Sequence, residues 1–177
     1  MKSLIPFCFL ILSISSAYAD QIEVCSTCKV KTIHEAVGLA QDGDQILIRQ
    51  GTYREHSIEV DKSLHFLGEQ GAVIDGENAG TVISFRSSNF SFKGLTIIND
   101  GQSYTKDFAG ILIHGSDSFV LEDNVLENFF FGILVEKSKN GKIHNNKVSS
   151  QALNEASSGN GIHLWHCSDM TISSNEV

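Results

Sequence analysis

The sequence GILIHGSDSFVLEDNVL at residues 110–126 recurs in altered form twice further along the chain. Residues 132–148 are GILVEKSKNGKIHNNKV and residues 161–177 are GIHLWHCSDMTISSNEV, so the three segments align without a gap. Each begins with glycine and an aliphatic residue, and each carries an asparagine at the same later position, at Asn124, Asn146 and Asn175. Residues 81–97 fit the same frame, with Leu95 in place of the asparagine. A repeat of this length, built of short apolar runs, indicates a solenoid of stacked coils.

Apolar side chains recur at every second position of these runs, which is the period of a strand and not of a helix. We predict four inward-facing columns, namely Val82, Ile111, Ile133 and Ile162; Ser84, Ile113, Val135 and Leu164; Phe92, Leu121, Ile143 and Ile172; and Ile97, Leu126, Val148 and Val177. The asparagines fall at a bend, where we expect a left-handed backbone and amide hydrogen bonds between coils. The sequence therefore predicts an all-β protein, a right-handed parallel β-helix with a structural asparagine ladder.

Two coils are longer than the coil between them. The additional residues lie at the same corner, in segments 98–109 and 149–160. Insertions at one corner project from one side of a solenoid, and that side is often its binding face. Surface loops without a binding role are the alternative, because loops tolerate insertions.

Residues 1–19 have the features of a secretory signal peptide. Lys2 precedes an apolar run at 4–14, and a small-residue cleavage site ends at Ala19. This segment is too short and wrongly flanked to span a membrane, so we predict a periplasmic protein that is not membrane-spanning. Removal of Lys2 changes the formal net charge from −8 to −9. Such an acidic exported chain is poorly suited to bind nucleic acid or anionic lipid.

The segment that follows, 20–41, is expected to close the solenoid at its N-terminal end. A capping-box pattern from Thr32 to Glu35 predicts a short helix that reaches about Ala40. A short amphipathic helix here would cover the open end of the stack. Residues 42–177 then form the coils. Because the last repeat stops within a strand, we expect the C-terminal coils and cap to be absent and the chain to be the N-terminal part of a longer protein.

The cysteines allow several interpretations. Cys25 and Cys28 form a C-x-x-C motif just before the predicted helix. In an oxidising compartment this pair can be a local disulfide, a soft-metal site for Cu(I), or a redox-active pair. Cys167 is the odd cysteine of the mature chain, and it is either a buried thiol or a ligand.

Residues 161–170 hold the densest group of chemically active side chains. Three of them, His163, His166 and Cys167, can ligate copper and lie within one coil. Met170 falls in one column with Phe90 and Phe119, so we assign it to the core. The alternation directs Trp165 outward, in a column that also contains Phe85, His114 and Glu136. A structural or partner-contact role for these outward residues is the alternative to a metal site.

A polysaccharide-active enzyme or a carbohydrate-binding solenoid is the competing class, because fold alone does not decide function. Acid–base hydrolysis needs two carboxylates about 5–9.5 Å apart in one cleft. The acidic residues here are scattered over coils and turns without a paired motif, namely Asp75, Glu77, Asp100, Asp107, Asp123 and Glu127. We therefore predict no catalytic residues and no enzyme activity.

Several motifs also resemble the NosD family, whose members carry β-helix repeats of the CASH type. They are Asp42-Gly43-Asp44, Gly51-Thr52-Tyr53, Val73-Ile74-Asp75-Gly76, Lys93-Gly94-Leu95-Thr96-Ile97 and, most specifically, Gly159-Asn160-Gly161-Ile162-His163-Leu164-Trp165. The resemblance implies a periplasmic accessory protein of nitrous oxide reductase maturation that works with an ABC transporter. It further implies transient handling of copper, as Cu(I), or of a sulfur species during assembly of the copper–sulfur centre of that reductase.

Overall fold

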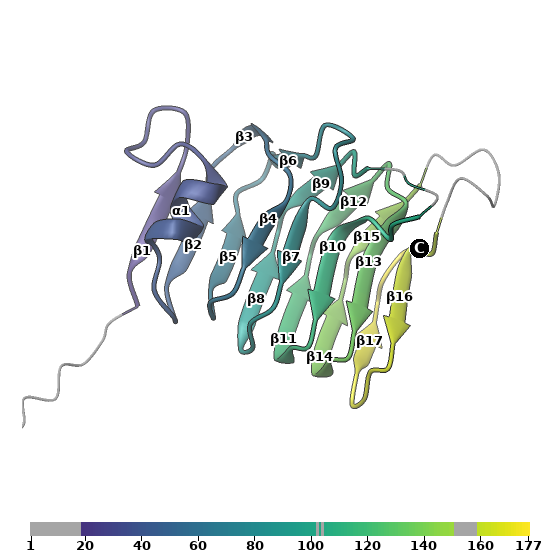
Figure 1. Ribbon diagram of the computed structural model, residues 1–177. Helices are drawn as coiled ribbons and strands as arrows, with labels where there is room; N and C mark the ends of the chain where they lie inside the picture. Colours follow the sequence, from purple (N-terminus) through teal and green to yellow (C-terminus); the bar gives the residue numbers. More distant parts are fainter. Residues whose placement is uncertain (1–18, 102, 104, 151–158) are drawn as a thin grey trace, which may run out of the picture.

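The computed structural model describes residues 19–101, 103, 105–150 and 159–177. Within them the chain forms a parallel β-helix in which three parallel sheets run along one stack of coils (Figure 1). Strands that neighbour each other in a sheet come from successive coils, so nearly all pairing is between residues about one coil apart in sequence. The predicted fold class is confirmed. Most of the predicted signal peptide, residues 1–18, lies outside the described residues.

The strands of each sheet follow one another in chain order. The first sheet contains β1 (Gln21–Val24), β2 (Gln45–Ile48), β5 (His65–Gly68), β8 (Phe90–Lys93), β11 (Asp117–Glu122), β14 (Lys139–His144) and β17 (Thr171–Ser173). The second contains β3 (Gly51–Arg54), β6 (Ala72–Asp75), β9 (Thr96–Ile98), β12 (Val125–Glu127) and β15 (Lys147–Ser149). The third contains β4 (Ile58–Val60), β7 (Ile83–Phe85), β10 (Ala109–His114), β13 (Phe131–Glu136) and β16 (Ile162–Trp165).

The core lies between the sheets and is filled by the inward-facing columns. Leu121 pairs with Phe92 on one side and with Ile143 on the other, as the repeat predicted. Ile143 pairs in turn with Ile172. The column through Leu126 is also found in the predicted register, between its partners on β9 and β15. Aromatic rings fill the wider middle coils, with centroids 4.2 to 5.8 Å apart among Phe66, Phe85, Phe90, Phe92 and Phe119.

In β7 the predicted register is wrong by one residue. Ile83 and Phe85, and not Val82 and Ser84, pair with the inward residues of β10. The physical reason is a shorter bend, because Phe85 precedes the next inward residue, Phe90, by five positions, whereas the later coils use six. A one-residue shift in a strand moves every side chain to the opposite face.

The three asparagines of the repeat form a continuous hydrogen-bonded ladder. Asn124 donates to Oδ1 of Asn146 from its main-chain N–H at 3.0 Å and from its side-chain amide at 2.9 Å. Asn146 donates in the same way to Oδ1 of Asn175, at 2.9 and 3.0 Å. Each side-chain amide also donates to a main-chain carbonyl of the neighbouring first-sheet strand, the oxygen of Phe92, Leu121 or Ile143 respectively. The ladder therefore joins the last three coils through buried or half-buried amides.

The expected left-handed backbone is found one residue before each asparagine. Asp123, Asn145 and Ser174 have φ angles of 58°, 52° and 57°. The residue in the left-handed conformation turns the chain, and the following asparagine then points its amide into the stack. The bend is therefore left-handed as expected, at the residue that precedes each ladder asparagine.

The predicted capping helix is present as α1 (Ile33–Leu39), and it packs at the end of the stack where β1 and β2 lie (Figure 1). Thr32 caps it by accepting a hydrogen bond from the main-chain N–H of Glu35 at 3.1 Å. The next coil holds both helix ends with charged groups. The Glu55 carboxylate accepts the N–H groups of Ile33 and His34, and the Lys62 ammonium donates to the carbonyls of Val37, Gly38 and Ala40. Each charge is opposite in sign to the end of the helix dipole that it contacts.

Both longer connections join the second sheet to the third, one between β9 and β10 and the other between β15 and β16. Parts of them, residues 102, 104 and 151–158, lie outside the described residues. No helix in the described ranges is long and apolar enough to cross a membrane.

Candidate functional site

The outer face of the third sheet carries three of the predicted contact residues side by side. His114 on β10 pairs with Glu136 on β13, which pairs with Trp165 on β16. The Nδ1 atom of His114 lies 3.0 Å from a carboxylate oxygen of Glu136. The Trp165 side chain is 54% exposed, more than most large apolar residues of the described chain. The structure thus forms a short polar and aromatic row on the outer surface.

Phe85 does not belong to this row, contrary to the prediction. It is fully buried and stacks on Phe90 with ring centroids 4.2 Å apart. The one-residue register error in β7 is the cause, because it exchanged the inward and outward positions of that strand. The burial pattern could have corrected it, since an inward Phe85 and outward Ser84 suit a core better than the reverse.

His163 lies in an aromatic cluster next to this row. Its ring is 5.5 Å from Phe131 and 6.3 Å from Trp165, measured between centroids. The ring of His166 meets Trp165 edge-on at 5.1 Å. The Nδ1 atom of His163 lies 2.7 Å from the side-chain amide nitrogen of Asn160. The cluster offers an aromatic surface on the outside of the last described coil.

The side chain of Cys167 points toward the core, away from the two histidine rings on the outer surface. Its thiol contacts the carbonyl oxygens of Val135 at 3.4 Å and of Trp165 at 3.5 Å, and the side chain packs against the core. Met170 also packs against the core, as its column predicted. Across the described ranges, no three or more His, Cys, Asp and Glu side chains gather in an arrangement that could hold a metal ion. The structure therefore does not assemble His163, His166 and Cys167 into one copper site.

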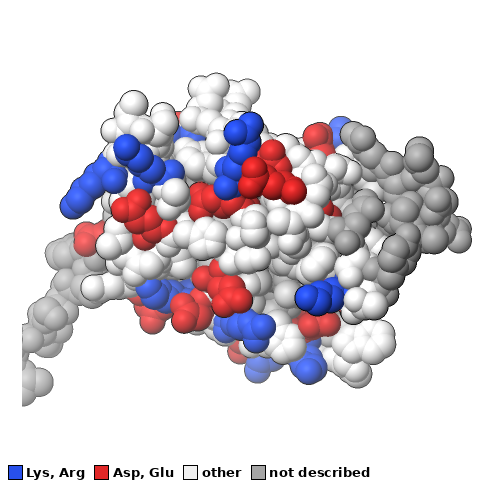
Figure 2. Space-filling model, turned by 45° about the horizontal axis from the view of Figure 1, so that its top comes forward, with Lys and Arg blue, Asp and Glu red and all other residues white. Residues whose placement is uncertain are grey.

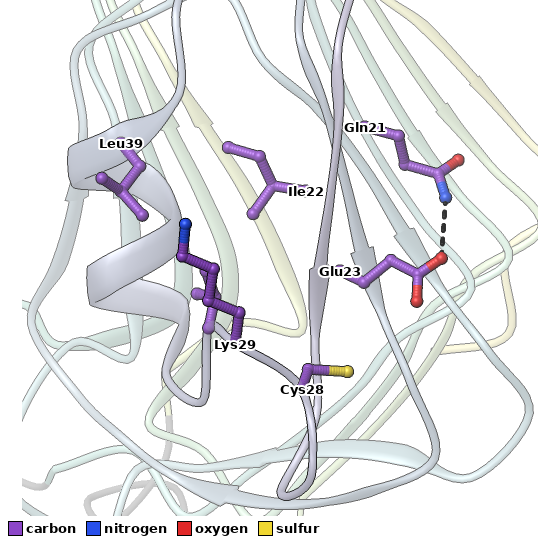
Figure 3. A pocket seen from close by; sticks show the side chains of 7 residues that line it. Gln21, Ile22, Glu23, Cys28, Lys29 and Leu39 are labelled. Carbon is purple, nitrogen blue, oxygen red and sulfur yellow. Dashed lines mark hydrogen bonds between the residues drawn. The ribbon is translucent and has the colours of Figure 1, made fainter.

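The second candidate metal pair, Cys25 and Cys28, forms a disulfide. This is one of the three interpretations that the sequence left open. The disulfide lies between β1 and α1, beside a pocket of about 570 Å³ (Figure 3). In this state the two sulfur atoms are bonded to each other, so no thiolate is available to a soft metal.

A second, polar pocket of about 420 Å³ lies at the N-terminal end of α1, and no sequence pattern predicts it. It is lined by Thr32, His34, Arg54, Glu55, His56 and Glu77. Glu55 is already engaged, because its carboxylate contacts the His34 ring at 2.7 Å and accepts the helix N–H groups. The residues that line this pocket are therefore arranged as a helix-capping cluster.

Asp100, one of the acidic residues that are scattered along the sequence, is a buried carboxyl group. It is 2% exposed, and one oxygen accepts the main-chain N–H of Phe130 at 2.7 Å. The other oxygen has no hydrogen-bond partner. Burial raises the pKa of Asp100 to about 7, against the smaller opposing effect of the Phe130 N–H. The burial of this carboxyl group is visible only in the structure and not in the sequence.

Other carboxylates stabilise corners and strand pairs. Asp75 and Asp123 each accept an amide hydrogen bond from an asparagine of the next coil, Asn99 and Asn145. A hydrogen bond from Lys93 lowers the pKa of Glu122. Acidic and basic side chains lie next to each other over the face seen in Figure 2. Asp75, Asp123 and Glu122 thus have structural partners, and their arrangement differs from a hydrolytic pair in an open cleft.

Comparison with known proteins identifies relatives by sequence. Residues 37–177 match the family described as periplasmic copper-binding protein (NosD). The probable ABC transporter binding protein NosD of Pseudomonas aeruginosa is 25% identical over 146 residues, which cover 81% of this chain and 34% of that protein. The chain thus spans about a third of the length of this curated relative.

Solved structures with a similar fold include two pectin methylesterases. PemA from Erwinia chrysanthemi has a TM-score of 0.56 and 21% identity, over 73% of this chain and 48% of its own. A pectin methylesterase in complex with a hexasaccharide has a TM-score of 0.57 and 19% identity, over 88% of this chain and 67% of its own. At these identities the likeness demonstrates a shared fold alone. The family match, in contrast, extends over 141 of the 177 residues, and the chain belongs to the NosD family of periplasmic copper-binding proteins.

Proposed function

We propose that this chain is part of a periplasmic accessory protein for assembly of the copper–sulfur centre of nitrous oxide reductase. In this role it works with an ABC transporter and has no enzymatic activity of its own. The observation that carries the proposal is the family match over residues 37–177, together with a relative named as an ABC transporter binding protein. The outer row of His114, Glu136 and Trp165 supports it, because an exposed aromatic residue beside polar neighbours suits contact with a protein partner.

The partner role is tested in cells that lack the endogenous protein and receive the full-length protein with a changed outer row. We expect Trp165→Ala to lower the copper content of the purified reductase, because the side chain is exposed and its loss removes contact area without opening the core. Leu67→Ala is the matched control, since Leu67 is 39% exposed on the first sheet, away from the row. Equal copper content in both variants and the wild type would contradict the assignment of this row.

Copper in this role is a cargo, and the described donors support two separate weak sites better than one cage. Cys25 follows β1, and Cys167 precedes β17. These strands are the first and seventh of one sheet, so six spacings of about 4.8 Å place them about 29 Å apart. The cysteine pair offers two thiolates only after reduction of its disulfide. His163 and His166 lie at the other end of the stack.

An anaerobic titration with Cu(I) and a competing chelator tests copper carriage. Reduced protein should bind Cu(I), and the double variant Cys25→Ser, Cys28→Ser should lower the stoichiometry. The double variant His163→Ala, His166→Ala should lower it independently. Protein with the disulfide intact is the control and should lack the cysteine-dependent part. Absence of bound Cu(I) in the reduced wild type would exclude direct carriage, and the maturation role would then depend on protein contacts.

A carbohydrate-binding or polysaccharide-active role is the second candidate, although the likeness to pectin methylesterases extends to the fold alone. We expect the mature protein to release no product from pectin, polygalacturonate or alginate, with or without Ca²⁺. Turnover that disappears in Asp123→Ala or Asp107→Ala would favour the enzyme instead. Asp123 already accepts a hydrogen bond from Asn145 at a corner, which favours a structural role for that residue.

A further inference from the structure

The loop that carries the disulfide is held in place by contacts that do not involve sulfur. The main-chain N–H of Cys25 donates to the carbonyl of Val30, and the N–H of Cys28 donates to the carbonyl of Cys25, both at 3.2 Å. Val24 and Val30, on either side of the loop, are buried and form a β-bridge. The hydroxyl of Tyr53 donates to the carbonyl of Val24 at 2.9 Å. These contacts hold the loop in addition to the disulfide, and none of them requires the bond between the two sulfur atoms.

Cys28 lies at the edge of an open apolar groove, the pocket of about 570 Å³ between β1 and α1. Its lining includes the apolar residues Ile22, Val30 and Leu39. In Figure 3, Lys29 lies with Ile22 and Leu39 between β1 and α1, whereas Gln21 and Glu23 point to the other side of β1. Leu39 is 60% exposed, whereas the other large apolar residues of α1 face the core and are buried. No described residue covers the Leu39 side chain. The helix thus directs one apolar residue toward solvent, in the groove that Cys28 also lines.

The chemistry of the groove identifies the class of its occupant. The disulfide is the one electrophilic group among its lining residues, and thiolates are the nucleophiles that attack disulfides. The aliphatic walls favour apolar side chains on either side of that thiolate. A polypeptide segment that carries cysteine between apolar residues satisfies both features.

We propose that the Cys25–Cys28 disulfide is a thiol–disulfide exchange site, at which a partner polypeptide with two cysteines docks in this groove and attacks Cys28. This proposal is independent of the copper role, because the exchange requires no metal.

The reaction balances in two steps. The first partner thiolate bonds to Sγ of Cys28, the bond between Cys25 and Cys28 breaks, and Cys25 leaves as a thiolate. The Thr27 hydroxyl, 3.4 Å from the Cys25 sulfur, can donate a hydrogen bond to that thiolate. The second partner thiolate then attacks the partner's own sulfur in the mixed disulfide and releases Cys28 as a thiolate. The partner is oxidised to a disulfide by two electrons, the Cys25–Cys28 pair is reduced to the dithiol, and the two cysteine thiolates take up protons from solvent.

The test uses oxidised mature protein with Cys167→Ser, so that the third cysteine cannot react. Two synthetic single-cysteine peptides, Ac-Leu-Cys-Leu-NH₂ and Ac-Ser-Cys-Ser-NH₂, carry the same thiol in apolar and polar surroundings. Mass spectrometry after acid quenching gives the rate of mixed-disulfide formation and its location. We expect the apolar peptide to react at least about tenfold faster, because its leucines are partly buried in the groove. The peptide should be attached to Cys28.

Two variants separate groove binding from simple access to the sulfur. Leu39→Glu should remove most of the advantage of the apolar peptide and leave the polar peptide within about twofold, and circular dichroism checks that α1 is retained. Leu67→Glu, the same change at a half-exposed leucine of the first sheet, should alter neither rate. Equal rates for both peptides, attachment at Cys25, or resistance of the disulfide to both peptides would each overturn the proposal.

Discussion

Replacement of Asn146 by leucine should destabilise the solenoid strongly for a single substitution. Asn146 is 1% exposed, and its Oδ1 atom is the acceptor for both the main-chain N–H and the side-chain amide of Asn124. Leucine has no acceptor, so two buried N–H bonds of Asn124 lose their partner. At about 1–3 kcal/mol for each of the two unsatisfied buried groups, we expect a loss of about 2–6 kcal/mol in the free energy of unfolding.

Urea unfolding of the mature chain, followed by circular dichroism and by Trp165 fluorescence, measures this loss. With a slope of about 2 kcal/mol per molar urea, the midpoint should fall by about 1–3 M. Asn160→Leu is the matched control, because Asn160 is exposed and its side-chain amide lies within hydrogen-bond distance of the half-exposed His163 ring. The control should stay within about 0.5 kcal/mol of the wild type. If Asn146→Leu were no less stable than Asn160→Leu, the amide ladder would make no net contribution to stability.

Two further predictions concern buried positions. Because the pKa of Asp100 is raised to about 7 in the folded chain and lies near 3.9 in an unfolded one, the folded state binds more protons between these values. The free energy of unfolding should therefore fall as pH rises from about 4 to about 7, by on the order of 4 kcal/mol relative to the Asp100→Asn variant. Parallel curves of Tm against pH for the two proteins would refute this. Gly132→Ala should destabilise by about 1–3 kcal/mol, because its Cβ would lie 2.5 Å from both the carbonyl oxygen of Gly161 and a methyl group of Val148. Gly38→Ala, in α1 with open space around it, should be neutral or stabilising by up to about 1 kcal/mol, and an equal fall in Tm for both alanine variants would show that crowding is not the cause.

The sequence was sufficient for the fold because the repeat constrains it many times over. Strand period, glycine spacing and the asparagine column all favour the same coil, so an error in one coil does not change the architecture. The columns through Leu121 and Leu126 were predictable for this reason, and their pairing in the structure follows the repeat. The capping helix was predictable from the Thr32–Glu35 pattern, which forms the N-terminal hydrogen bond as expected.

The parts that were not predictable depend on bends and on contacts distant in sequence. The single missing residue in the bend after β7 reversed the predicted faces of Ser84 and Phe85, and no pattern within β7 alone fixes its register. The hydrogen bond that Asp100 accepts comes from the main chain of Phe130, thirty residues later, so local sequence carries no sign of this environment. The groove beside Cys28 needs an exposed Leu39 next to β1, a relation that only the position of α1 creates.

Function in this solenoid is restricted to the positions that the fold leaves free. Strand pairing uses most main-chain groups, the inward columns fill the core, and the corner asparagines and aspartates bond to neighbouring coils. Two features remain that this pattern does not explain, the exposed Trp165 on β16 and the groove with Leu39 and Cys28 beside β1. They lie at opposite ends of the described stack (Figure 1), so one small partner cannot contact both. Changes at Trp165 and at Leu39 should therefore affect different interactions. The free-energy effect of the double variant on partner binding should be the sum of the effects of the two single variants. A strongly non-additive double variant would instead indicate one extended partner that spans the coils.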